Sequence, residues 1–302
     1  MHMTLRDWAH LILLSVLWGG AFFLVAIALR EIPPLTIVLS RVSIAAIVLL
    51  IVLLLKGERL PVSRNVLLAF LIMGFLNNLV PFSLLFWAQT SISSGLASIL
   101  AATTPIFSII VAHLALADER MEANKFVGVI FGVAGVAILV GGNVWHGPDM
   151  ATLGMLACVG AALSYGFASV YGRRFRSMGI SSSTVALGQL SATTLMMLPI
   201  AAFVDQPWSL PAPSLNTIMS ILALAVASTA LAYVIFFRLL ASVGAVNVAL
   251  VTLLVPISAI VLGFAFLGEH LQGRHYFGMS LIAAGLAAVD GRLIRKLRKR
   301  KV

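Results

Sequence analysis

Long apolar stretches separated by short charged or turn-rich segments fill most of this chain. One crossing of a hydrocarbon layer needs roughly 20 apolar residues, and a backbone in lipid must pair its own polar groups within a helix. Period-two alternation of the kind found in strands is absent. The pattern predicts an all-α integral membrane protein with ten transmembrane helices, at residues 8–29, 33–55, 66–89, 93–117, 123–142, 151–172, 180–204, 214–237, 243–267 and 273–291.

Composition narrows the class of protein further. Of the 302 residues, 61% are hydrophobic and 10% are charged, whereas soluble domains carry about 45–50% apolar and about 25% charged residues. A soluble enzyme is therefore excluded. The single cysteine, Cys158, excludes an internal disulfide and any multi-cysteine metal site. No phosphate-binding GxxxxGK[ST] motif or catalytic motif is present, so we expect no enzyme activity, no cofactor and no metal.

The positive charges are distributed unevenly between the loops. With the N-terminus placed in the cytoplasm, 17 of the 20 Lys and Arg residues fall on that side, and only Arg30 and Arg274 fall on the other. The positive-inside rule then places both termini in the cytoplasm and requires an even number of spans. The basic tail at 292–302 is expected to bind anionic lipid. Because topology and lipid binding account for the net charge of +10, we expect no nucleic acid partner.

The two halves of the chain align with each other. Pro105-Ile106-Phe107-Ser108 aligns with Pro256-Ile257-Ser258-Ala259, and after one dropped residue Glu119 aligns with Glu269. Each half has five predicted spans, so the second half enters the membrane from the opposite side. Inverted repeats of this kind are typical of secondary transporters, whose substrate site lies where the repeats meet. We expect a first repeat at 1–147, a second, inverted repeat at 148–291 and the tail at 292–302.

These features together resemble a known family. Trp18-Gly19, Arg41, Pro105 followed by Glu119, and Pro256 followed by Glu269 are similar to the ten-helix drug/metabolite transporter superfamily, in the members that have two EamA-type repeats. The resemblance covers essentially the whole chain. It implies a multi-pass transporter that exports amino acids, other metabolites or toxic compounds. Bacterial inner-membrane amino-acid exporters are most similar in length and organisation, which implies an inner-membrane location.

Polar residues inside a span are costly and are therefore candidate binding groups. Asn77 and Asn78 lie near the middle of the third span, and Tyr233 follows Ser228 and Thr229 in the eighth. The side-chain amides offer both donors and acceptors, as a zwitterionic solute would require. The alternative is that they form hydrogen bonds between helices. Asn77, Asn78 and Tyr233 are predicted to bind substrate.

Three further residues complete the predicted binding set, and a fourth is assigned a different role. Trp18 and Tyr165 occupy equivalent positions in the two repeats and suit the wall of an apolar cavity, although packing is the alternative. Gln189 is the repeat equivalent of Arg41. A guanidinium in this position is able to bind a substrate carboxylate, but a structural or gating role for Arg41 is favoured.

Prolines and glycines predict how the helices bend and touch. Pro105 and Pro256 lie within the fourth and ninth spans, where proline kinks a helix, so they are candidate hinges. Small residues allow membrane helices to approach closely. The glycines expected to serve in helix packing are Gly128, Gly132, Gly135, Gly278 and Gly285.

Every Asp and Glu lies at a span end or in a loop. A transporter without an embedded acid is poorly suited to cation coupling, so we expect a facilitator for neutral or zwitterionic metabolites. The alternative is a proton-coupled exporter of drugs or toxic compounds, in which His113 would relay protons. A lipid-modifying enzyme and a passive channel are weaker alternatives. The sequence leaves the oligomeric state open, a monomer included.

Overall fold

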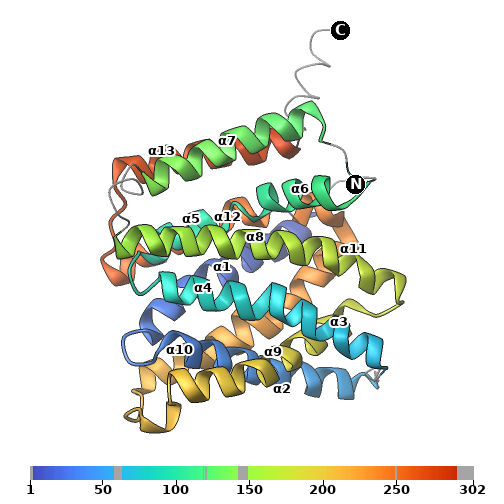
Figure 1. Ribbon diagram of the computed structural model, residues 1–302, viewed down its shortest axis with the longest axis vertical. Helices are drawn as coiled ribbons and strands as arrows, with labels where there is room; N and C mark the ends of the chain where they lie inside the picture. Colours follow the sequence, from blue (N-terminus) through green and yellow to red (C-terminus); the bar gives the residue numbers. More distant parts are fainter. Residues whose placement is uncertain are drawn as a thin grey trace.

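The computed structural model describes residues 3–57, 63–117, 119, 121–141, 149–248 and 250–290. All regular structure within these residues is helical (Figure 1). The predicted boundary between the repeats at 147/148 and the basic tail at 292–302 lie outside the described residues. The helices are α1 Leu5–Ala28, α2 Pro34–Leu55, α3 Arg64–Gly74, α4 Val80–Ala88, α5 Ser94–Ala101, α6 Thr104–Ala115, α7 Ala123–Val140, α8 Met150–Ser177, α9 Ser182–Val204, α10 Leu215–Ala225, α11 Ala232–Val248, α12 Val251–Leu267 and α13 Gly273–Asp290.

Within the residues that the structure describes, eight helical segments are long and apolar enough to cross a membrane. α3 and α4 together form one of these segments, and α5 and α6 together form another. α12 is apolar but shorter. Large hydrophobic side chains such as Leu54, Phe203 and Phe264 are exposed on the outer surface, as expected for a protein whose solvent there is lipid. An all-helical membrane protein is thus confirmed for the described residues. The count of ten spans in two inverted repeats stays a prediction.

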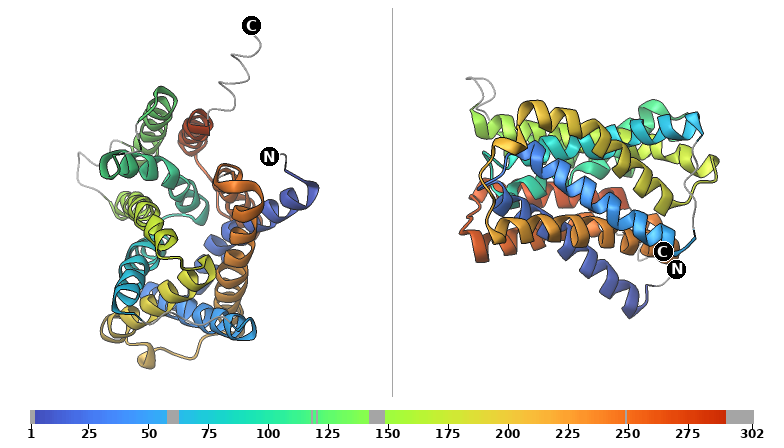
Figure 2. Two further views of the ribbon diagram at one scale, coloured as in Figure 1. Left: turned by 90° about the vertical axis from the view of Figure 1, so that its right-hand side faces the viewer. Right: turned by 90° about the horizontal axis from the view of Figure 1, so that it is seen from below.

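The helices lie roughly side by side, with their ends at two opposite faces (Figures 1 and 2). We call α1–α7 the N-terminal half and α8–α13 the C-terminal half. Helices from the two halves interleave, because α2 packs on α9 and α1 packs on α12. The cavity described below is therefore built by both halves together.

Helices α7 and α13 form a close pair along one edge of the molecule (Figure 1). A Cβ atom added to Gly285 would lie 2.6 Å from the carbonyl oxygen of Gly128, and one added to Gly135 would lie 2.8 Å from the carbonyl oxygen of Gly278. Gly132 instead faces Ile106 of α6. Glycine is needed at these contacts because any side chain would push the two backbones apart.

Two short π-helical segments lie at corresponding positions in the two halves. η1 (Phe75–Leu79) joins α3 to α4, and η4 (Val226–Leu231) joins α10 to α11. Pro81 is the second residue of α4, just after η1, and its missing N–H leaves a carbonyl of the preceding turn without its usual helical donor. Such π segments are frequent at functional sites, because they change the direction of the side chains that follow.

The predicted helices at 93–117 and 243–267 are both interrupted. α5 ends at Ala101 and α6 begins at Thr104, with Pro105 in its first turn. In the second half the start predicted at 243 is wrong: α11 runs to Val248 across a kink at Gly244, which has φ +79°, and α12 begins at Val251. This left-handed backbone favours glycine. Pro256 lies inside α12, so the break in this half precedes its proline.

Candidate functional site

A cavity of about 910 Å³ lies between the two halves. This volume is at the upper end of the range of about 300–1,000 Å³ that is usual for small-molecule sites. Side chains of α1, α2, α4, η1, α8, α9, η4 and α11 contribute to its wall. The principal aromatic and polar residues of the wall are Trp18, Arg41, Asn77, Phe82, Phe86, Gln89, Tyr165, Gln189, Ser228, Thr229, Tyr233, Phe236 and Phe237.

Arg41 is the charged group in the middle of this wall. It is only 7% exposed, and its Nε donates a hydrogen bond of 2.9 Å to Oγ1 of Thr229. Its guanidinium carbon lies 3.9 Å from the centre of the Phe82 ring and 5.7 Å from that of Phe86. The aromatic faces stabilise the buried cation through their π electrons. The structure thus places Arg41 on the wall of the cavity, in addition to any role in gating.

Tyrosine and amide side chains line the same cavity as the guanidinium. The side chains of Tyr165 and Tyr233 lie close enough to Arg41 to interact with it electrostatically. Asn77 donates a hydrogen bond of 3.0 Å to Oε1 of Gln189, which links η1 of the first half to α9 of the second. The wall therefore combines one cation with hydroxyl and amide groups, each of which is able to orient a polar solute.

Trp18 and Asn78, both predicted to bind substrate, lie in different environments in the structure. Trp18 lines the cavity, with its ring 5.6 Å from that of Phe236. Asn78 is fully buried outside the wall, and its Nδ2 donates to Oγ1 of Thr193 at 3.3 Å. The structure therefore places Asn78 in the contact between η1 and α9, which was the packing alternative for this residue, and we omit it from the proposed binding set.

Several wall residues were not identified from the sequence. Phe82 and Phe86 are four residues apart on one face of α4, and both face Arg41. Aromatic residues are common in any membrane helix, so their spacing alone did not distinguish them. Thr229 was noted only as a polar residue preceding Tyr233, although its hydroxyl accepts a hydrogen bond from the guanidinium of Arg41. The π segment that brings Thr229 to this point has no clear signal in the sequence.

The described residues that line the cavity include no Asp or Glu. Two arginines do line it: Arg41, which is buried, and Arg176, which is exposed at the end of α8. The remaining surface is mostly aromatic and aliphatic. The electrostatic environment inside the cavity is therefore positive and favours an anionic group on a bound molecule.

At one end of the bundle, carboxylates bind the N-termini of helices from the other half. Glu269, which follows α12, accepts hydrogen bonds from the backbone amides of Ser94 at 2.8 Å and Gly95 at 3.2 Å, and from the Ser94 hydroxyl at 2.8 Å. A carboxylate at this position satisfies amides that have no partner within the helix and interacts favourably with the helix dipole.

Two similar contacts lie at the same end, on the left in Figure 1. Asp205 accepts hydrogen bonds from the backbone amide and hydroxyl of Thr36 at 2.7 and 2.9 Å. Glu31 accepts one from the backbone amide of Ser214 at 2.7 Å. The hydrogen bonds from Ser214 hold the pKa of the Glu31 carboxyl below its usual range. We call the contacts made by Glu31, Asp205 and Glu269 the cross-half contacts.

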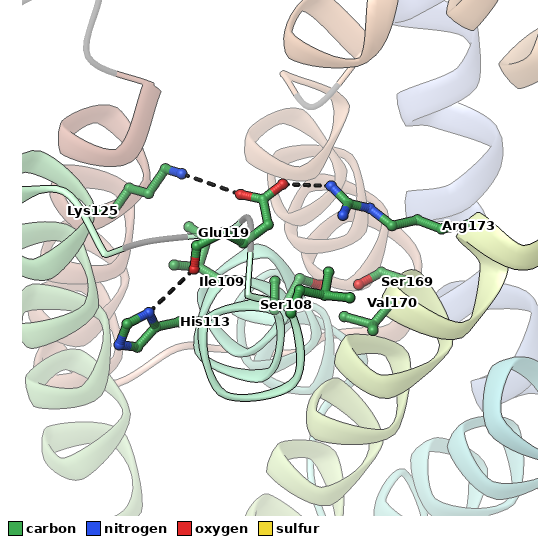
Figure 3. A pocket seen from close by; sticks show the side chains of 10 residues that line it. Ser108, Ile109, His113, Glu119, Lys125, Ser169, Val170 and Arg173 are labelled. Atoms are coloured by element: carbon green, nitrogen blue, oxygen red, sulfur yellow. Dashed lines mark hydrogen bonds and ion pairs between the residues drawn. The ribbon is translucent and has the colours of Figure 1, made fainter.

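The opposite end carries a different arrangement, beside a second cavity of about 220 Å³ (Figure 3). Glu119 pairs there with Lys125 at 3.6 Å and with Arg173 of α8. Nδ1 of His113 lies 3.2 Å from the backbone oxygen of Glu119. Glu119 and Glu269 are equivalent in the sequence repeat, yet Glu119 pairs with charged side chains while Glu269 binds backbone amides.

The described part of the chain contains no group of three or more His, Cys, Asp and Glu side chains that could hold a metal ion. Cys158 is buried on α8 and does not line the large cavity.

Comparison with known sequences identifies similar proteins. The sequence profile described as the EamA-like transporter family matches residues 8–141 and again residues 152–289. The chain is 28% identical over 279 residues to the "Uncharacterized inner membrane transporter YedA" of Escherichia coli (strain K12), covering 91% of this chain and 88% of that one. It is 26% identical over 295 residues to the "Probable amino-acid metabolite efflux pump" of the same strain, covering 94% of each chain.

Comparison with solved structures gives the same fold. A protein crystal structure superposes with a TM-score of 0.66 at 19% sequence identity, covering 97% of this chain and 98% of the other. At this identity the similarity concerns the fold alone.

Proposed function

Because the chain belongs to the EamA-like transporter family, we propose that it is a secondary transporter that exports amino acids or similar small metabolites across the bacterial inner membrane. The observation that carries this proposal is the cavity between the two halves, with Arg41, Tyr165, Tyr233 and the Asn77–Gln189 pair on its wall. A site of this size with a few converging polar groups suits a small organic solute. The relative named as an amino-acid metabolite efflux pump supports the choice of substrate.

The proposed mechanism is alternating access between two inverted five-helix repeats. The cross-half contacts lie at one end, whereas at the other end an ion pair between Glu119 and Arg173 joins the halves. The cavity wall extends toward the other end, where it includes Arg176, Ile180 and Ser182. This state is closed at the carboxylate end and accessible from the opposite end. With both termini in the cytoplasm, as the positive-inside rule predicts, the cavity faces the cytoplasm.

Transport is proposed to be facilitated rather than driven by an ion. The described cavity wall contains no carboxylate that would bind Na⁺ or carry a proton through the membrane. The alternative is a proton-coupled exporter of toxic compounds. It predicts transport driven by a pH gradient and weakened by His113→Ala.

Counterflow in proteoliposomes tests the proposal. Vesicles containing the purified protein are loaded with an unlabelled neutral amino acid, and uptake of the labelled compound is measured. We expect saturable exchange that is abolished by Ala101→Trp, since Ala101 lines the cavity. The matched control, Leu114→Trp, places the same ring at a residue that is 79% exposed and should leave the exchange intact. Absence of saturable exchange with every neutral amino acid would overturn the proposal.

A further inference from the structure

We propose that the large cavity selects small organic monocarboxylates with an apolar body, that Arg41 binds the carboxylate, and that a ligand ammonium group adds nothing to affinity. This inference rests on the proposed function and names the class of substrate for the same site. It differs from a general preference for amino acids, because the protein would recognise only the carboxylate end of the ligand.

Arg41 is a buried cation whose contacts, within the described part of the chain, include no carboxylate. A buried charge is costly unless it is paired. Within the described residues, the hydrogen bond of Arg41 is the one from Nε to Thr229, while the guanidinium has five N–H donors. The terminal nitrogens therefore remain to be satisfied at the cavity wall. A carboxylate matches two parallel N–H donors in geometry and in charge.

The direction of the guanidinium is fixed by its neighbours. The Thr229 hydroxyl donates its own proton to the carbonyl of Leu224 at 2.8 Å, so its oxygen is free to accept from Nε of Arg41. Phe82 stacks on one face of the same group. With Nε and one face occupied, a ligand reaches the guanidinium at the edge that carries the terminal nitrogens. Preorganisation of this kind lowers the entropic cost of binding.

Tyr165 and Tyr233 provide further polar groups on the same cavity wall. Both side chains line the cavity and interact electrostatically with Arg41. A phenol hydroxyl is able to donate to a carboxylate oxygen. The carboxylate would thus be held by charge and by neutral donors together, which is the arrangement that discriminates most strongly against a ligand lacking the group.

The rest of the wall offers no counter-charge for an ammonium group. No Asp or Glu is among the described lining residues, and the other charged residue of the wall, Arg176, is also positive. Trp18, Phe86 and Phe236 present apolar surface instead. An amino acid would therefore bind by its carboxylate and side chain, while its ammonium group would have to remain hydrated inside a positive cavity.

Four ligands with the same branched body test the two claims separately. Leucine carries both charged groups, isocaproate only the carboxylate, leucinamide only the ammonium group, and isocaproamide neither. Binding of each to the full-length protein in lipid nanodiscs is measured by calorimetry. We expect isocaproate to bind at least tenfold more tightly than isocaproamide, and leucine to bind no more tightly than isocaproate. A factor of ten is the size expected for the loss of one charged hydrogen-bond pair.

Variants then assign the effect to Arg41. In Arg41→Gln the preference for isocaproate over isocaproamide should disappear, and in Arg41→Lys it should be reduced. Arg238→Gln removes an exposed arginine outside the cavity wall and should retain the preference. Because the comparison of ligands on the unchanged protein is decisive in itself, poor folding of an Arg41 variant would not prevent the test.

Each outcome has a defined meaning. Equal binding of isocaproate and isocaproamide, or an unchanged preference in Arg41→Gln, overturns the role of Arg41. Leucine binding tenfold more tightly than isocaproate overturns the claim about the ammonium group. In both cases the counterflow assay still reports transport if the proposed function is right, so failure of this inference is distinguishable from failure of the proposed function.

Discussion

The carboxylate of Glu269 lies 2.8 Å from the backbone nitrogen of Ser94, at the N-terminus of α5. These residues belong to different halves of the chain, so the hydrogen bond between them joins the halves at one end of the molecule. Glu119, the residue equivalent to Glu269 in the sequence repeat, pairs with Arg173 and Lys125 at the other end. Two carboxylates in equivalent positions of the repeat therefore have different partners: backbone amides for Glu269 and charged side chains for Glu119.

Glu269→Gln should open the carboxylate end. The amide keeps the shape of the side chain but loses the charge. A charged hydrogen bond contributes about 1 kcal/mol more to stability than a neutral one. This corresponds to a roughly fivefold rise in the open population. The measurement is the rate at which an impermeant thiol reagent, added on that side, modifies Ala21→Cys in a Cys158→Ser background. Ala21 lines the cavity.

The matched control for this experiment is Glu122→Gln. Glu122 is an exposed carboxylate at the N-cap of α7, and its side chain makes no capping hydrogen bond there. Its substitution should leave the modification rate of the reporter unchanged. If Glu269→Gln gives the same rate as the unsubstituted reporter, the contact between Glu269 and Ser94 does not hold this end closed.

The hydrogen bond between Asn77 and Gln189 should contribute to stability as a pair. Asn77→Ala and Gln189→Ala should each lower the thermal unfolding midpoint, and the double variant should lower it by less than the two effects added. The expected coupling is about 0.5–1.5 kcal/mol, the usual net contribution of one hydrogen bond. Asn77→Ala combined with Thr194→Val is the control, since the Thr194 hydroxyl bonds within its own helix. Additive effects in the Asn77–Gln189 cycle would contradict the pairing.

A single methyl group at Gly285 should separate α7 from α13. The added Cβ would lie 2.6 Å from the carbonyl oxygen of Gly128 and 2.9 Å from the backbone nitrogen of Gly132, both of which are backbone atoms. Overpacking of this kind typically costs about 1–3 kcal/mol. Gly285→Ala should therefore lower the unfolding midpoint measurably. Gly273→Ala, on the same helix but with no atom within 4 Å of the new methyl group, should leave it unchanged.

Acidification should weaken the contact between Glu31 and Ser214. Hydrogen bonds from Ser214 lower the pKa of the Glu31 carboxyl from its usual value of 4.5. A carboxyl whose pKa is lowered in the closed state stabilises that state above its ordinary pKa, and the stabilisation is lost as the pH falls through the lowered value. Below that pH, the fraction of molecules in which the two halves are separated at the carboxylate end should increase.

Spin labels at Thr90→Cys and Gln272→Cys, two exposed residues in different halves, report this separation as a distance distribution. The distribution should shift to longer distances at acidic pH. Glu31→Gln should reduce the pH-dependent shift, because the carboxyl whose pKa is lowered in the closed state is then absent. A pH response that is identical with and without Glu31 would rule out its contribution.

Much of the architecture could be predicted from the sequence because lipid imposes a local rule. Each apolar stretch must pair its own backbone, so the helices and their approximate ends follow from composition along the chain. The family resemblance carried by residues such as Trp18 and Glu269 is confirmed. Where the prediction was wrong, at the start of the span placed at 243, a single residue with positive φ, Gly244, interrupts the helix.

The candidate site was predicted less completely. Asn77 and Asn78 are neighbours with the same side chain, yet Asn77 lines the cavity and Asn78 packs against Thr193. Adjacent residues of a helix point in different directions, and the π segment alters these directions further. Sequence alone offered no means of choosing between them. The binding role proposed for Asn77 and the other wall residues stays a prediction.

The sequence by itself determined that this chain is a multi-helix membrane protein of the EamA-like family, because hydropathy and motif spacing are properties of consecutive residues. Only the tertiary structure decided that Arg41 faces a cavity beside Phe82, and that Glu269 binds a helix end 175 positions earlier in the chain. Such contacts depend on which helix faces are brought together and on their register. No periodicity within a single span encodes that choice.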